Sequence, residues 1–291
     1  MRMNTDCYPC IAREALDAAR LATPDETLQL AVLKKILGKL SVLDPDWPPP
    51  LMARFIQETV GEMTGVRDPY ARLKEKYNTM ALAMMPELTA MKAGQDALKR
   101  FETGVRLAIA GNIIDFGTAS TVGREKLMAT ITHAMETRVT GSVDGFRTAV
   151  EGASHILWLG DNAGEIVFDR LLLEEMDCGK VIYAVRGGPI QNDATIEDAR
   201  TSGLTEMVRV MDTGALIPGT LLPYCTDAFV REFERADLII SKGQGNFETL
   251  DHDDPRVYFL FKAKCGVVAR QAGCDLGDVV IKQGGVTGGM G

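Results

Sequence analysis

The chain has 291 residues, of which 46% are hydrophobic and 25% are charged, and its formal net charge is −8. This composition is typical of a soluble globular protein with enough apolar material for a core, and the acidic balance argues against a broad surface that binds nucleic acid. No run approaches the length of a membrane span and the N-terminus lacks the apolar segment of a secretory signal, so we expect a cytoplasmic protein with no membrane partner.

Residues 11 to about 150 are predicted to be mainly helical. The stretches 11–22 and 25–43 carry apolar residues at helical spacing, with Thr23 as the expected N-cap of the second and Pro24 in its first turn. The run DPDWPPP at 44–50 interrupts the helical pattern, because consecutive prolines cannot continue a helix. Further helical patterns follow at 51–63, 69–85, 92–110, 122–138 and 142–152.

After residue 152 short apolar runs alternate with helix-length segments. The apolar runs lie at 155–159, 180–185, 207–211, 237–240 and 257–261, the clearest helical segments lie at 165–177, 193–202 and 226–235, and DVVIKQ follows as a final strand. Alternation of this kind predicts βαβ units and a mostly parallel sheet. We therefore expect an α/β fold in which a helical N-terminal region, residues 1–152, packs on an α/β region, residues 153–291.

Polar residues and glycines follow each predicted strand. The segments are GDNAGE at 160–165, RGGPIQNDAT at 186–195, DTG at 212–214, SKGQGNFE at 241–248 and KAK at 262–264. One such strand end is ordinary turn chemistry, but ligands of open parallel sheets bind beyond the carboxyl ends of the strands. Five in succession predict the rim of an active site.

The residue types in these segments favour a divalent cation with a phosphate beside it. Asp161, Asn162 and Asp193 offer hard oxygen ligands with no His or Cys nearby in sequence, a set that suits Mg²⁺ or Mn²⁺ better than zinc. Lys242 and Lys262 could neutralise phosphate oxygens, and two helices are expected to point their N-termini at the same place. This α/β region is thus predicted to be a metal- and phosphate-binding domain.

Each of these residues also has a simpler interpretation. Asp161 and Asn162 could be the N-cap of the following helix, and Asp193 could cap the next one, because Asp and Asn are favoured caps. SKGQGNFE could be a turn with a solvated lysine. Agreement between successive strand ends is the argument for a shared site.

The segments GDNAGE, RGGPIQNDAT, SKGQGNFE and FKAKC, with GNIIDFG at 111–117 and DCYPC at 6–10 upstream, resemble the signature segments of the metal-dependent damage-control phosphatases, formerly domain of unknown function 89, in their prokaryotic branch. The resemblance runs from Asp6 to Cys265. It implies a Rossmann-like core with a helical N-terminal region, and a divalent cation (Mg, Mn, Co or Ni) held by Asp161, Asn162 and Asp193. It also implies hydrolysis of small phosphate monoesters such as sugar phosphates or damaged phosphometabolites.

The same resemblance implies a set of residues that line the substrate and phosphate pocket: Asn112, Asp115, Glu165, Lys242, Asn246 and Lys262. From the residues alone, GNIIDFG indicates a helix C-terminus with Gly111 as terminator. The resemblance is what assigns Asn112 and Asp115 to the pocket.

Asp161, Asp193 and Lys242 are the expected catalytic residues. The nucleophile is either a water oriented by a carboxylate such as Asp193, or the Asp161 carboxylate itself, which would form an aspartyl phosphate. The Asp-x-Asp arrangement of haloacid-dehalogenase-type phosphatases is absent at the first strand end, which favours water. The expected partner is a small phosphorylated metabolite; the sequence fixes neither its identity nor the oligomeric state.

Two other functions compete with the phosphatase. The glycine-rich turns would also suit a transferase that binds a nucleotide or S-adenosylmethionine, although no Gly-x-Gly-x-x-Gly follows the first strand. Alternatively, Cys7 and Cys10 could serve a non-enzymatic metal-binding protein. We expect reduced thiols at all six cysteines, with Cys7 and Cys10 in a packed N-terminal turn.

Overall fold

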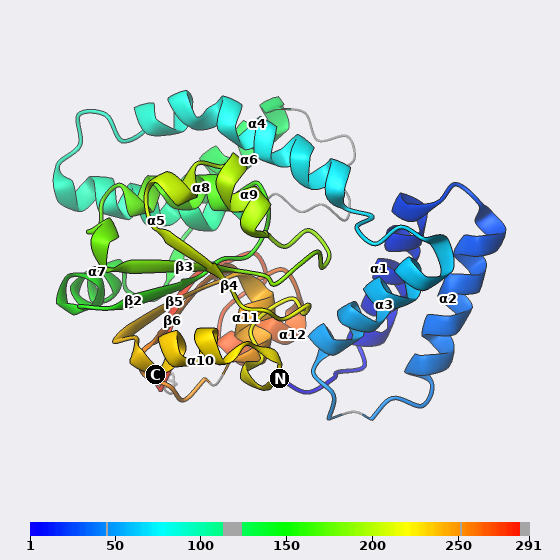
Figure 1. Cartoon of the computed structure of the whole chain (residues 1–291). Coiled ribbons are helices and arrows are strands. Elements are labelled where there is room, and N and C mark those ends of the chain that lie inside the picture. Colours follow the sequence, from blue (N-terminus) through cyan, green and yellow to red (C-terminus); the bar gives the residue numbers. More distant parts are fainter. Residues whose placement is uncertain (45, 113–123, 251, 286–291) are drawn as a thin grey trace.

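A seven-stranded sheet with the order β1-β7-β6-β5-β2-β3-β4 forms the centre of the molecule (Figure 1). The computed structural model describes residues 1–44, 46–112, 124–250 and 252–285. The strands are β1 (Val139–Thr140), β2 (Ile156–Leu159), β3 (Val181–Val185), β4 (Arg209–Asp212), β5 (Leu238–Lys242), β6 (Val257–Lys262) and β7 (Val279–Gln283). Strands β2 to β6 run parallel, whereas β7 is antiparallel to β6. The predicted mostly parallel α/β fold is confirmed.

Helices cover both faces of this sheet, as βαβ connections require. On one face the apolar core lies between the strands and α5 (Ala97–Gly111), α7 (Val143–Gly152), α8 (Glu165–Leu173) and α9 (Ile196–Thr201). On the other face it lies against α10 (Asp227–Arg235), α11 (Gly243–Thr249) and α12 (Gly266–Ala272). An outer layer of α4 (Ala71–Ala90) and α6 (Arg124–Glu136) packs over α5 and α8 (Figure 1). The central strands are therefore buried on both sides.

The first three helices form a module of their own, called here the N-terminal module: α1 (Cys7–Ala22), α2 (Glu26–Leu40) and α3 (Pro49–Thr64). A separate apolar cluster around Ile11, Val32 and Ile36 holds these helices together. Figure 1 shows this module standing beyond the carboxyl ends of the strands, with α1 and α3 turned towards the sheet. The module is therefore placed to border a site at that edge. The division of the chain at residue 152 stays a prediction.

The start of α2 differs from the prediction in its capping residue. Asp25, not Thr23, is the N-cap: its carboxylate accepts hydrogen bonds from the backbone N–H of Thr27 at 2.8 Å and of Leu28 at 3.3 Å. The Thr23 hydroxyl accepts only from the N–H of Asp25, before the helix begins. The prediction that Thr23 caps this helix was wrong, because the Asp25 carboxylate, two residues closer to the helix, satisfies two free N–H groups at once.

We expect Asp25→Ala to lower the free energy of unfolding by about 1 kcal/mol, because it removes that cap. Thr23→Ala is the matched control and should change it by only a few tenths of a kcal/mol, since Thr23 caps no helical N–H. Urea unfolding followed by circular dichroism measures both values. Equal losses in the two variants would contradict the assignment of Asp25.

Several elements were not predicted. Strand β1 is too short to give an apolar pattern, and α11 and α12 begin next to glycine-rich or lysine-rich segments for which no helix was predicted. Helix α4 continues through Pro86 to Ala90, where the prediction ended it at the residue before the proline. No helix within the described ranges is both long enough and apolar enough to cross a membrane.

Candidate active site

The site residues gather at the topological switch point of the sheet. From β2 the chain proceeds to β3 and β4 on one side and later to β5 and β6 on the other, so the strand order reverses between β2 and β5. Ligands of open parallel sheets bind beyond the carboxyl ends of the strands at such a point, and this region is called here the crevice. Asp161 follows β2, and Gly243 follows β5 with a φ of 77°. A Cβ atom at Gly243 would overlap the Asp161 carboxylate. Only glycine allows this close approach in this left-handed conformation.

Asp161, Asn162 and Asp193, which are separated in sequence, lie together in this crevice. Asn162 and Asp193 form an isolated β-bridge, and the N–H of Ala194 donates to the Asp161 carbonyl at 2.8 Å. The Arg186 guanidinium joins the two carboxylates: its Nε donates to Asp193 Oδ2 at 2.6 Å, and its Nη2 lies 3.9 Å from Asp161 Oδ1. All of these side chains are buried.

None of the three predicted ligands is a helix cap. Helix α8 begins after Gly164, which offers no side chain, and α9 begins after Thr195, which forms a capping box with Asp198. The capping interpretation of Asp161, Asn162 and Asp193 is therefore wrong. Their side-chain polar atoms form hydrogen bonds and ion pairs within the crevice instead.

The side-chain amides of Asn112 and Asn162 bridge the carboxylates of Asp161 and Glu165. Asn112, at the end of α5, donates through Nδ2 to Asp161 Oδ2 at 2.9 Å and to Glu165 Oε2 at 2.8 Å. Asn162 Nδ2 donates to the same two oxygens at 2.7 and 3.0 Å. The Oδ1 atom of Asn112 is buried with no hydrogen-bond partner among the described residues. Asp115, predicted to lie in the same pocket, falls outside them.

Lys242 lies beneath this network. Its fully buried Nζ donates to Glu165 Oε1 at 2.7 Å, to Asp169 Oδ1 at 2.5 Å and to the carbonyl of Ala108 at 3.0 Å. Burial alone would lower the pKa of this ammonium group, but the Asp169 and Glu165 carboxylates raise it above its ordinary value. All three donors are used by the protein, so Lys242 fixes the position of Glu165 and is not open to an anion in this structure.

Asn246 and Lys262, the other predicted pocket residues, lie on α11 and at the end of β6. Asn246 is buried behind Arg186: its Oδ1 accepts from Arg186 Nη2 at 3.4 Å and its Nδ2 donates to the Lys242 carbonyl at 2.8 Å. Lys262 is half-buried at the end of β6, where burial and the neighbouring Lys264 lower its pKa. The Lys264 charge also acts on Asp161, so a lysine pair stands near the carboxylates.

The crevice concentrates buried negative charge. Burial raises the pKa of Asp161 well above its usual range, Glu165 and Asp193 raise it further, and Arg186 and Lys264 oppose them. Burial likewise raises the pKa of Asp193, against the effect of Arg186. Carboxylates that are difficult to ionise together are stabilised by a proton or a bound cation, so their arrangement suits a cation site.

Three important residues were missed from the sequence. Arg186 immediately follows β3, so its position at a strand end was a usable signal. Asp169 lies one helical turn after Glu165 on α8, which places both carboxylates on the face towards Lys242. Asn78 on α4 accepts from the Gly164 N–H at 2.6 Å and donates to Asp198 at 2.8 Å. Nothing in the sequence marked Asn78, which lies far from both partners along the chain.

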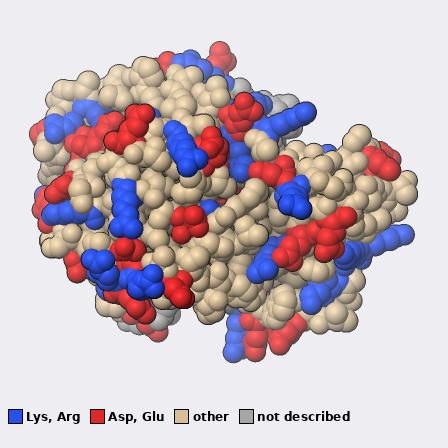
Figure 2. All heavy atoms as spheres, viewed as in Figure 1, with Lys and Arg blue, Asp and Glu red and all other residues tan. Residues whose placement is uncertain are grey.

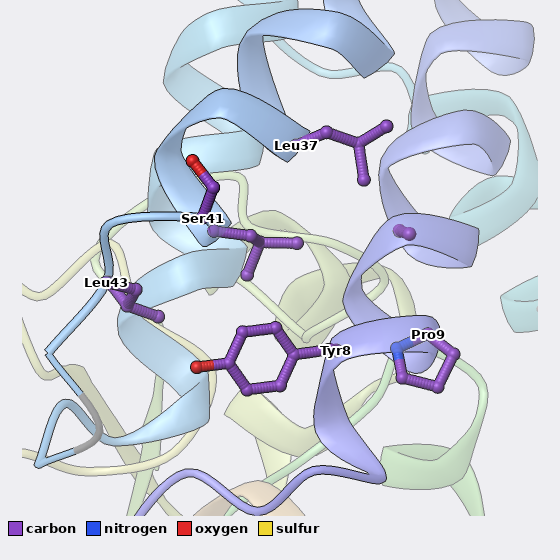
Figure 3. A pocket seen from close by; sticks show the side chains of 7 residues that line it. Tyr8, Pro9, Leu37, Ser41 and Leu43 are labelled. Carbon is purple, nitrogen blue, oxygen red and sulfur yellow. The ribbon is translucent and has the colours of Figure 1, made fainter.

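A hollow of about 440 Å³ lies within the N-terminal module, away from the site residues (Figure 3). It lies between the start of α1, with Tyr8, and the end of α2, with Leu37 on the helix and Ser41 just after it. Its lining carries no ionisable group other than the Tyr8 phenol. It therefore lacks the chemistry of a phosphate site.

The cysteines form no recognisable metal centre. All six lie within the described residues and are free thiols, as predicted. Cys7 and Cys10 lie in the first turn of α1, and burial raises the pKa of both. Within the described ranges no three His, Cys, Asp or Glu side chains gather in a group that could hold an ion by themselves. The hypothesis of a metal site built on Cys7 and Cys10 thus gains no third ligand from the fold.

The fold and the crevice define an α/β protein of the Rossmann-like type, with a carboxylate and amide cluster at the switch point. Residues 3–280 match the family model described as the damage-control phosphatase ARMT1-like domain, and the chain belongs to this family. The family of phosphatases that the sequence motifs resemble is thereby confirmed, and membership supports a phosphatase activity.

Archaeal relatives match over nearly their whole length. An uncharacterised protein of Methanocaldococcus jannaschii is 37% identical over 97% of this chain and 95% of its own. Damage-control phosphatases of Pyrococcus horikoshii and Archaeoglobus fulgidus are 34% and 32% identical, over 93% and 97% of this chain and 94% and 99% of theirs. The crystal structure of a DUF89 family protein from P. horikoshii superposes with a TM-score of 0.87 at 31% identity, covering 98% of this chain and 99% of that one.

Proposed function

We propose that this protein is a divalent-metal-dependent phosphatase that hydrolyses small phosphate monoesters. The observation that carries the proposal is the buried cluster of Asp161, Asn162 and Asp193 at the switch point, in a chain that belongs to a phosphatase family. Sugar phosphates and damaged phosphometabolites are the proposed substrates.

The donors present fit a hard cation. Asp161 and Asp193 would supply carboxylate oxygens, and Asn162 would supply an amide oxygen after releasing its hydrogen bond from Asn192, which is 2.7 Å long. The Oδ1 atom of Asn112, which has no hydrogen-bond partner among the described residues, is a further oxygen. Oxygen-only sets with two carboxylates suit Mg²⁺, Mn²⁺ or related ions. Such an ion, when bound, polarises a phosphoryl oxygen and offsets charge in the transition state.

The chain's own residues would divide the remaining work. Asp193 is the proposed acceptor of the proton from the attacking water, because burial raises its pKa above the ordinary value of a carboxyl group. Arg186 holds this carboxylate in place at 2.6 Å and leaves positive charge facing the crevice. Lys262 and Lys264 are proposed to neutralise the phosphate, while Lys242 and Asn246 orient Glu165 and Arg186.

The test is release of inorganic phosphate from p-nitrophenyl phosphate and a panel of sugar phosphates. We expect turnover with Mg²⁺, Mn²⁺, Co²⁺ or Ni²⁺, loss of that turnover when a chelator is added, and recovery on return of the ion. Equal activity before and after complete removal of divalent ions would contradict the metal dependence. Absence of turnover on every ester with every ion would contradict the phosphatase itself.

A further inference from the structure

The N-terminal module contacts the loop that carries Asp193. Gln191 in this loop has a φ of 46°, a left-handed conformation that non-glycine residues rarely adopt. Its N–H donates to Gln57 Oε1 of α3 at 3.4 Å, and its side chain hydrogen-bonds to the Glu14 carboxyl group of α1. The loop between β3 and α9 reaches towards α1 and α3 in Figure 1. A strained residue thus joins the module to the candidate active site.

Glu14 brings a half-buried acidic side chain to this junction. Its Oε1 atom is enclosed and has no hydrogen-bond partner in the part of the chain that the structure describes. Burial raises the pKa of Glu14 to about 7, with Glu248 of α11 and Asp193 adding to the effect. An enclosed carboxyl oxygen without a donor costs free energy unless something else supplies the donor.

The charges around Asp161 and Asp193 differ between the sheet region and the N-terminal module. Figure 2 shows the surface hollowed between the sheet region and the lobe formed by α1 to α3. The charges suited to the phosphate, Arg186 and Lys264, act on Asp161, whereas Glu14 acts on Asp193 from the side of the module. Glu14 and Glu248 together would repel a second anionic group on the substrate and would accept hydrogen bonds from neutral donors.

We propose that Glu14, held by Gln191, is a specificity-determining residue that accepts a hydrogen bond from a hydroxyl group on the organic part of the phosphate ester. The proposal rests on the phosphatase function argued above. It assigns the N-terminal module to recognition of a hydroxylated monophosphate, and the sheet region to the phosphoryl group.

Kinetics with two classes of ester test this role. Glucose 6-phosphate and ribose 5-phosphate carry hydroxyl groups, whereas p-nitrophenyl phosphate and phenyl phosphate carry none. We expect Glu14→Ala to lower kcat/KM for the hydroxylated esters by about 10- to 100-fold and to change it by less than about 2-fold for the others. Glu14→Gln should retain part of the preference, because its amide oxygen still accepts a hydrogen bond. Glu62→Gln, on the exposed side of α3, is the control and should behave as the natural chain does.

Parallel losses on both ester classes would show that Glu14 only supports the structure, and no loss on either would show that it has no role; both results overturn the proposal. Circular dichroism and thermal unfolding confirm that each variant is folded. Calorimetric binding of glucose 6-phosphate and phenyl phosphate with Mn²⁺ gives an independent measure. If the natural chain hydrolyses neither class, the phosphatase proposal fails, and an unchanged affinity of Glu14→Ala for glucose 6-phosphate would then overturn the role of Glu14 separately.

Discussion

Asp161→Asn is expected to lower kcat for phosphate-ester hydrolysis by about 1000-fold or more. The variant keeps the shape of the side chain but removes the charge that, in the proposed site, would hold the cation. Loss of about 4 kcal/mol of transition-state stabilisation corresponds to that factor. The phosphate-release assay at saturating Mn²⁺ measures it, with Asp193→Asn as a second variant that should fall comparably.

The same variant is expected to fold as stably as the natural chain or more so. Burial and the neighbouring carboxylates raise the folded-state pKa of Asp161 above its value in the unfolded chain. A raised carboxyl pKa contributes stability at low pH that is lost as pH rises through the folded value, so the buried carboxyl group lowers stability as the pH increases. Asparagine removes that cost, and its Oδ1 can still accept from Asn112 and Asn162.

Asp237→Asn is the matched control. The Asp237 carboxylate lies before β5, at the opposite end of the sheet, and accepts from the N–H groups of Ser154 and His155 at 3.0 Å each. Its replacement should lower stability slightly and leave turnover unchanged. Near-normal turnover of Asp161→Asn at saturating Mn²⁺, with Asp237→Asn also active, would remove Asp161 from the ion site.

The strands were predictable because central parallel strands are buried on both faces and form uninterrupted apolar runs. The runs at 155–159 and 180–185 correspond to β2 and β3 within one residue at each end. Strand β1 has two residues and gains its place only by pairing with β7, which no local pattern reveals. Helices α11 and α12 lie over the sheet because of tertiary packing, against the low helical propensity of glycine.

The convergence of Asp161, Asn162 and Asp193 was predictable from the rule that parallel strand ends meet at one edge. The direction of the Lys242 side chain was not predictable, because the residue that ends a strand can point to either face of the sheet. In the structure it points towards α5 and α8, where Asp169 and Glu165 neutralise it. Glu14 and Asn78 come from helices remote in sequence, so only the packing of the module and of α4 brings them to the crevice.

Lys242→Met is expected to lower the free energy of unfolding by about 3 to 5 kcal/mol, because it leaves two buried carboxylates without their cation. The pKa of Asp169 is already raised to about 6 by burial, even with the lysine beside it. Without Lys242 the pKa of Asp169 should rise further, so the variant must take up protons to fold. The loss should therefore be smaller at pH 5 than at pH 8, which urea unfolding at both pH values measures.

Two further variants separate a buried positioning role from direct phosphate binding by Lys242. Lys99→Met removes a more exposed pair with Glu102, 2.8 Å long, and should change stability by less than about 0.5 kcal/mol. Lys242→Met combined with Asp169→Asn should recover part of the lost stability, since one uncompensated charge is then gone. If Lys242→Met instead kept normal stability at pH 8 and lost only affinity for phosphate, the lysine would be an anion ligand, as its place at the strand end first predicted. Because Glu165 also fixes Asn112 and Asn162, we expect stability and turnover to fall together.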